Sequence, residues 1–154
     1  MRSINFLIIF LVFFGCKDDQ VNPDTTEIKI GEEFELEYKT SGKVIAKATN
    51  AALEFTLQSV SDSRCPENAN CFWAGNAKVN GKIKSNESDE QLELVFCIGD
   101  CSSEGHPEGY TIQDTVDFDL DDKSYMAVLK AVTPFPSLID TADTKTVLVE
   151  ILEK

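Results

Sequence analysis

The sequence predicts an all-β protein, built as an antiparallel β-sandwich, with a closed β-barrel as the alternative. Two observations predict it. Apolar and polar residues alternate with a period of two in many short segments, as in strands that have one buried and one wet face. Turn-forming residues separate these segments, and no long stretch has the period of a helix.

The first strands follow a polar segment, residues 17–26, which has no apolar period. Apolar residues then alternate with charged ones over 27–30 and 33–38. Further strands are expected at 44–48 and 53–57 because the alternation resumes there. Residues 61–70 have the composition of a loop.

The second half of the chain continues the pattern. Ala77, Val79 and Ile83 flank Asn80-Gly81, which indicates either a tight hairpin or a bulge. Residues 125–132 fit a strand or a short helix, and Pro134 and Pro136 end that segment. The other strands expected here lie at 92–96, 110–112, 116–120 and 145–152. Seven to nine short strands are typical of an Ig-like architecture, although the Cys and Trp spacing of true immunoglobulin domains is absent.

The N-terminus predicts export and lipidation. Arg2 precedes the apolar run 6–14, which is too short to span a bilayer, and Gly15 stands where a signal peptide is cut. The Gly15-Cys16 pair resembles the lipobox of bacterial lipoproteins, although two phenylalanines precede it where a Leu and a small residue are usual. The resemblance implies cleavage after residue 15 and lipidation of Cys16, with the membrane as the partner of the acyl chains.

The residues after Cys16 suggest a location. Lys17-Asp18-Asp19-Gln20 resembles the lipoprotein export signal of Bacteroidetes, which implies display on the outer face of the outer membrane. The expected organisation is therefore a signal peptide at 1–15, a lipidated tether at 16–26 and a single β domain at 27–154. The mature chain has 13 basic and 27 acidic residues, a net charge of −14. Such a surface repels nucleic acid.

Four cysteines remain after Cys16: Cys65, Cys71, Cys97 and Cys101. An even number in an exported domain predicts two disulfides rather than a metal site. A crossed pairing would close a longer loop and stabilise by about 3.5 kcal/mol, against about 2 kcal/mol for each local loop. Turn-forming residues inside both short segments favour the local pairs, so we expect Cys65–Cys71 and Cys97–Cys101.

The most distinctive stretch is 61–79, SDSRCPENANCFWAGNAKV. It resembles uncharacterised small secreted or lipid-anchored bacterial domains, in which an Arg-Cys-Pro turn precedes a Cys-x-Trp-Ala-Gly strand and a Pro-x-Pro segment precedes the last strand. No function comes with the resemblance. On a strand, Cys71 and Trp73 would face the same side, so we expect Trp73 to be buried against the disulfide. The alternative is a Trp that stacks on sugars.

The function suggested by these features is a lipid-anchored accessory or binding module that is not an enzyme and needs no cofactor. Motifs of nucleophilic, metalloprotease or phosphate-binding sites are absent. One alternative is a serine protease inhibitor that presents Arg64 on its disulfide-held loop. Arg64 is otherwise expected to be solvated or paired with Asp62 or Glu67. A second is an envelope enzyme with a carboxylate site.

Three further features of the sequence concern calcium binding, the single histidine and glycosylation. The run from Asp117 to Asp122 begins like a calcium loop but lacks the Gly and Glu that an EF-hand needs, so we expect a wet strand face. His106, the only histidine, lies in an expected loop. Thr25, Thr115 and Thr141 lie in tripeptides that resemble a Bacteroidetes O-glycosylation sequon.

Overall fold

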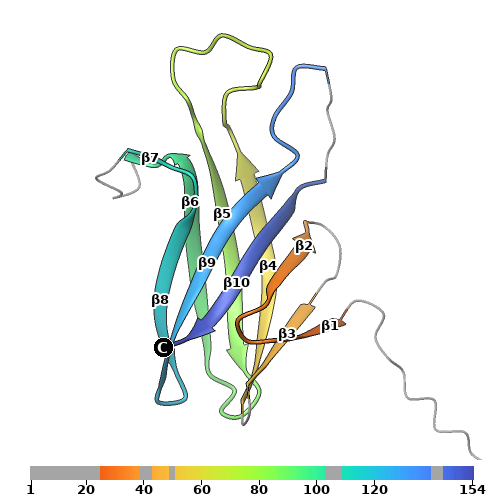
Figure 1. The fold of residues 1–154 in the computed structure, drawn as a ribbon, viewed down its shortest axis with the longest axis vertical. Coiled ribbons are helices and arrows are strands. Elements are labelled where there is room, and N and C mark those ends of the chain that lie inside the picture. Colours follow the sequence, from red (N-terminus) through yellow and green to blue (C-terminus); the bar gives the residue numbers. More distant parts are fainter. Residues whose placement is uncertain (1–24, 39–42, 49–50, 103–108, 140–143) are drawn as a thin grey trace, which may run out of the picture.

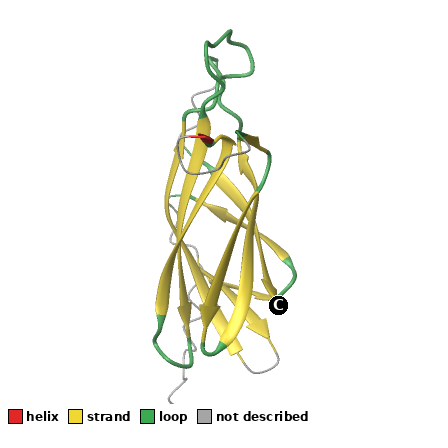
Figure 2. Cartoon of the chain, turned by 90° about the vertical axis from the view of Figure 1, so that its left-hand side faces the viewer, coloured by secondary structure: helices red, strands yellow, loops and turns green. Residues whose placement is uncertain are grey.

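The computed structural model describes residues 25–38, 43–48, 51–102, 109–139 and 144–154. Two β-sheets pack face to face and contain no α-helix among these residues (Figures 1 and 2). The sheets are not closed into a barrel, so the β-sandwich prediction is confirmed and the β-barrel alternative is wrong. The predicted positions outside the described residues are Cys16, Lys17, Asp18, Asp19, His106 and Thr141.

The first sheet has six strands in the order β1-β3-β4-β5-β6-β7. Its core is an antiparallel meander of β3 to β6, and β1 joins its edge as a parallel partner of β3. Two-residue β7 pairs with the end of β6. The bounds are β1 Thr25–Lys29, β3 Lys43–Ala48, β4 Ala51–Asp62, β5 Asn76–Ser85, β6 Gln91–Asp100 and β7 Tyr110–Thr111.

The second sheet has four antiparallel strands in the order β2-β10-β9-β8. Strands β8, β9 and β10 form a meander, and β2 pairs with β10 from the other end of the sequence. The ambiguous segment 125–132 lies within a strand, β9. The bounds are β2 Glu33–Glu37, β8 Asp114–Leu120, β9 Lys123–Thr133 and β10 Thr146–Glu153.

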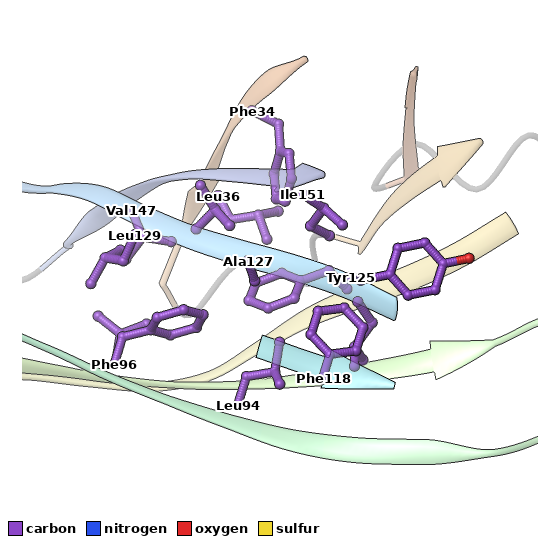
Figure 3. Close-up of a cluster of buried hydrophobic side chains, with 14 of the residues drawn as sticks. Phe34, Leu36, Leu94, Phe96, Phe118, Tyr125, Ala127, Leu129, Val147 and Ile151 are labelled. Carbon is purple, nitrogen blue, oxygen red and sulfur yellow. The ribbon is translucent and has the colours of Figure 1, made fainter. Parts of the chain in front are cut away.

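The core lies between the sheets and is built from the apolar residues of the period-two pattern. In β10, for example, Val147, Val149 and Ile151 are fully buried, whereas the residues between them are partly exposed. Phe34 of the second sheet meets Phe55 of the first edge to face, with ring centroids 5.8 Å apart. Figure 3 shows how side chains from both layers meet in this cluster.

Gly81 lies inside a strand, so the hairpin interpretation of Asn80-Gly81 is wrong. Strand β5 continues through it, and the pairing register of β4 shifts between Leu57 and Ser59, opposite this point. A Cβ on Gly81 would lie 2.3 Å from Cζ of the buried Phe55 ring. Glycine therefore serves here to admit an aromatic ring against the backbone, and the irregularity lies in β4 rather than at Asn80-Gly81 itself.

Candidate functional site

One end of the sandwich carries long loops, and we call it the loop end: residues 63–75, 99–102, 109–112 and 134–139. The 63–75 loop rises above the ends of β4 and β5 in Figure 1. Its base extends the hairpin, because Ser63 N donates to Asn76 O at 2.7 Å and Cys65 N to Ala74 O at 2.7 Å. Backbone bonds beyond the strand ends therefore hold the loop in one shape.

Both disulfides lie at the loop end and have the local pairing that the sequence predicts. Cys65 is bonded to Cys71 and Cys97 to Cys101, each with Cα atoms 5.9 Å apart. The first bridge closes the tip of the 63–75 loop, and the second ties the end of β6 to the turn that follows it. Covalent links thus restrain both segments that frame the site.

Two glycines allow the framing segments to touch. A Cβ on Gly75, which has a φ of +68°, would lie 2.0 Å from the Ser63 carbonyl oxygen. A Cβ on Gly99, with a φ of +98°, would lie 2.6 Å from the Gly75 carbonyl oxygen. Both the positive φ and the close backbone approach require glycine at these positions. They bring Asp100 beside the loop, where its N–H donates to Gly75 O at 2.8 Å.

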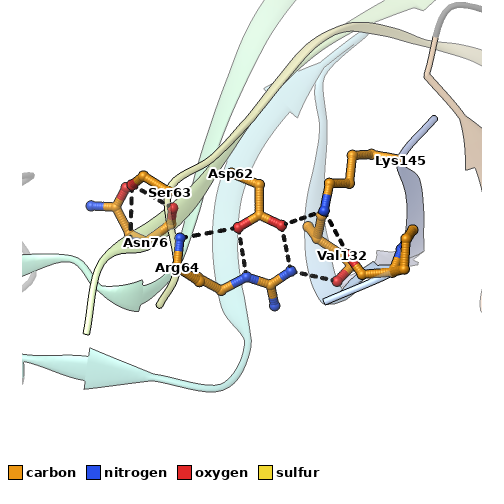
Figure 4. Close-up of polar contacts among 7 residues, drawn as sticks. Asp62, Ser63, Arg64, Asn76, Val132 and Lys145 are labelled. Carbon is orange, nitrogen blue, oxygen red and sulfur yellow. Dashed lines mark hydrogen bonds and ion pairs between the residues drawn. The ribbon is translucent and has the colours of Figure 1, made fainter. Parts of the chain in front are cut away.

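Arg64 points into the molecule, which contradicts its proposed role in a protease inhibitor. Only 7% of the residue is exposed. Its guanidinium forms a two-pronged ion pair with Asp62, with Nε 2.8 Å from Oδ1 and Nη2 2.7 Å from Oδ2. Nη2 also donates to Val132 O at 2.7 Å, and the group lies 4.2 Å from the Phe135 ring centroid. A side chain held in this way is not presented to a protease (Figure 4).

The Arg64 contacts belong to a polar cluster that joins the two sheets. Asp62 ends β4, whereas Val132 belongs to β9 of the other sheet. Lys145, just before β10, places Nζ 2.9 Å from Asp62 Oδ2 and donates to Pro134 O at 2.6 Å. Burial alone would raise the pKa of Asp62, but the hydrogen bonds from Arg64 and Lys145 and the charge of Arg64 outweigh it and lower the pKa. The carboxylate is therefore stabilised as an anion.

Trp73 is exposed, so the prediction of a buried Trp against the disulfide is wrong. Residues 71–75 form no strand, and the argument that Cys71 and Trp73 share a strand face does not apply. Trp73 is 71% exposed and Phe72 is 98% exposed. The two rings pack edge to face with centroids 6.1 Å apart. The loop thus presents an aromatic pair to solvent.

Exposed apolar side chains are concentrated at the loop end. A neighbouring segment, 134–139, joins the 63–75 loop through bonds from Glu67 N to Pro136 O and from Leu138 N to Asn68 Oδ1. Among the large apolar residues that are exposed in the described part of the chain, all but Val95 lie here: Phe72, Trp73, Tyr110, Ile112, Leu138 and Ile139. Clustering of this kind marks interaction surfaces more often than scattered exposure does.

Trp73 forms one wall of an open pocket with a volume of about 340 Å³. The rest of the lining comes from the base of the loop and the end of β6: Ser63, Gly75, Asn76, Asp100 and Ser102. A smaller hollow of about 180 Å³ lies nearby, lined in part by Arg64, Tyr110 and Phe135. The volume of the pocket beside Trp73 falls at the lower end of the roughly 300–1,000 Å³ that small-molecule sites occupy.

Sequence reasoning missed most of this pocket. It singled out Trp73 and the cysteines but assigned no role to Asn76, Asp100 or Ser102. Their positions in the sequence could have indicated them, because Asn76 follows the Trp-Ala-Gly motif and Asp100 and Ser102 flank Cys101. Lys145 was also missed, because its partner Asp62 is 83 positions away in the sequence.

The remaining predicted sites lie elsewhere. Thr115 is exposed on β8, but the neighbouring Asp114 is buried and accepts a bond from Cys97 N at 2.8 Å. Thr25 lies in β1. Asp117 and Asp119 lie on the exposed face of β8, as expected for a wet strand face.

Groups of three or more His, Cys, Asp or Glu side chains placed to hold a metal are absent from the described residues. A general acid needs a raised pKa, whereas those of Asp62, Asp89 and Asp121 are lowered. Lys84 lowers the pKa of Asp89, and Ser85 lowers that of Asp121, through hydrogen bonds.

Comparisons of the chain with protein-family models, curated proteins and solved structures find no match. Within the described residues, no helix has the length and apolar character needed to cross a membrane. The geometry of the loop end is therefore the basis for the function proposed next.

Proposed function

We propose that this chain is a binding module, held by a lipid on Cys16 at the surface of a bacterial outer membrane, and that the loop end is its binding surface. The observation that carries the proposal is the exposed pair Phe72 and Trp73 on a disulfide-closed loop. Large aromatic side chains left in water are unfavourable for a folded chain alone, and they are the residue types that dominate binding hot spots. Restraint of the loop lowers the entropy lost on binding.

The orientation of the sandwich fits this role. The proposed tether, residues 16–26, leads into β1, which lies in the lower half of Figure 1, whereas the 63–75 loop lies at the top. The tether would therefore enter the sandwich away from the loop end. The acidic surface would further discourage contact with anionic lipid headgroups.

The binding function can be tested with loop variants. The chain carrying Cys16→Ser, immobilised on beads, would be incubated with soluble envelope and extracellular material of the producing cells. The comparison is with Phe72→Ser/Trp73→Ser and with Val95→Ser, which removes an exposed apolar residue of β6 remote from the loop end. We expect the unaltered loop and the Val95 variant to retain components that the double variant does not. Equal retention by all three would refute the proposal.

The attachment can be tested separately. Cys16→Ser should move the chain from the membrane fraction to the soluble fraction, because acyl chains supply the membrane affinity. Replacing Lys17, Asp18 and Asp19 with Ala should protect the chain from protease added to whole cells while leaving it in the membrane fraction. Persistence of the Cys16 variant in salt-washed membranes would refute lipidation at this residue.

A further inference from the structure

The pocket beside Trp73 combines an aromatic wall with short polar side chains. Its lining residues are Ser63, Gly75, Asn76, Asp100 and Ser102 in addition to the indole. Hydroxyl, amide and carboxylate groups are therefore present, and none of the described residues that line the pocket is a Lys or an Arg. Pockets of this composition recognise ligands that have both an apolar face and a rim of hydrogen-bonding groups.

Hydrogen bonds hold these polar groups in place. Ser63 Oγ donates to Asn76 O at 3.0 Å, and Asn76 Nδ2 donates to Asp100 O at 2.8 Å. Ser102 bonds to Asp100 through Oγ at 2.8 Å and through its N–H at 3.4 Å, and both bonds reach Oδ1 rather than Oδ2. A carboxylate can accept about four hydrogen bonds and an amide both donates and accepts. The pocket thus offers acceptors and donors that are already oriented.

The charge of the site narrows the class of ligand. Asp100 and the overall net charge of −13 oppose phosphates, nucleic acids and other anions. A neutral sugar ring suits both parts of the pocket, because its C–H face can lie on the electron-rich face of an indole and its hydroxyls can bond the amide and carboxylate. Trp73 is available for such a contact because it is 71% exposed and is restrained by its loop.

We propose that Trp73 and the pocket lined by Asn76 and Asp100 bind a neutral carbohydrate. The proposal deepens the binding function proposed above and rests on it. Trp73 would supply the stacking surface, and Asp100 and Asn76 would fix the orientation of the sugar by bonding its hydroxyls.

The test uses the full-length chain with Cys16→Ser in affinity electrophoresis. The gels would contain xylan, mannan, laminarin, dextran or hydroxyethylcellulose, and fluorescence titration with the matching oligosaccharides would follow. Because Trp73 is the only Trp in the chain, the emission reports on this pocket alone. We expect at least one polysaccharide to retard the protein and its oligosaccharide to shift the emission.

Three variants and a control define the site. Trp73→Ala should weaken retardation roughly tenfold or more, as expected for loss of one stacking contact, and Trp73→Phe should restore part of it. Asp100→Asn should weaken binding while leaving the melting temperature unchanged. Val95→Ser, which removes an exposed apolar residue of β6 outside the loop end, should bind like the parent.

Several outcomes would overturn the proposal. Absence of retardation and of emission changes with all five polysaccharides would refute carbohydrate binding. If tetramethylammonium chloride shifts the Trp73 emission and none of the oligosaccharides does, the pocket binds cations, which aromatic rings also attract, and not a carbohydrate. Suppose that no carbohydrate binds. If the beads that carry the parent still retain components that the Phe72→Ser/Trp73→Ser variant does not, the binding function stands and only the carbohydrate proposal falls. If retention is equal, both proposals fall.

Discussion

Replacing Arg64 with Ala tests the polar cluster that joins the two sheets. The change removes a two-pronged bond to Asp62, a bond to Val132 O and the contact with the Phe135 ring. Breaking a buried ion pair typically costs about 3–5 kcal/mol. Lys145 still compensates Asp62 at 2.9 Å, so we expect the lower end, about 3 kcal/mol. For a domain of this size that corresponds to a fall in melting temperature of roughly 10–15 °C.

The assay is urea unfolding followed by circular dichroism, with thermal melts as a second measure. Lys29→Ala is the matched control because it removes one positive charge from an exposed position of β1. It should change the free energy of unfolding by no more than about 0.5 kcal/mol. Arg64→Lys should be intermediate, since an ammonium group keeps the charge but cannot form the two-pronged bond. An Arg64→Ala variant as stable as the Lys29 control would refute the role of the cluster.

Three further predictions concern the fold. The pKa of Asp62 lies below its ordinary value of 3.8, so the stabilising effect of this carboxylate is complete above that pH and is lost as the pH falls through the folded-state pKa. The difference in free energy of unfolding between the parent and Asp62→Asn should therefore shrink only below about pH 3.8. A difference that is already declining at pH 6 would contradict this assignment. Gly81→Ala should lower the free energy of unfolding by about 1–3 kcal/mol, because the new methyl group would overlap the Phe55 ring. In a chain that carries Phe55→Leu, the same change should cost less. If the effects of the two substitutions simply add in the double variant, the contact is not supported. Replacing Cys65 and Cys71 with Ser opens a seven-residue loop and should lower the free energy of unfolding by about 2 kcal/mol. The pairing itself is checked by peptide mapping of the parent under non-reducing conditions. A peptide that links Cys71 to Cys97 would contradict it.

The fold could be predicted because burial follows a simple period. Alternation in segments such as β2 and β10 identifies the inward residues without knowledge of their partners. The parallel pairing of β1 with β3 could not be obtained in this way, because alternation does not specify which strand lies next to which. The strand order, one meander for each sheet with β2 added at the end, also lies outside what periodicity determines.

The site was harder to predict because local spacing placed Trp73 in the core, whereas the structure exposes it. The Trp73 prediction assumed a strand through Cys71–Gly75, but the disulfide and the turn at Gly75 make this segment a loop. Sequence proximity identifies Asp62 as one partner of Arg64, but it does not show that the pair is buried. Val132, which accepts a bond from Arg64, and Lys145, which pairs with Asp62, come from distant parts of the sequence, and only the packing of the two sheets brings them together.

The central claim is that Trp73 belongs to a binding surface and not to the core. The most direct measurement is the fluorescence of this single Trp in the native protein, with iodide quenching, alongside the stability of Trp73→Ala. An exposed indole predicts red-shifted emission, ready quenching by iodide and a change in free energy of unfolding within about 0.5 kcal/mol for the variant. Blue-shifted emission that resists iodide, together with the loss of about 3–5 kcal/mol that removal of a core Trp causes, would contradict the claim.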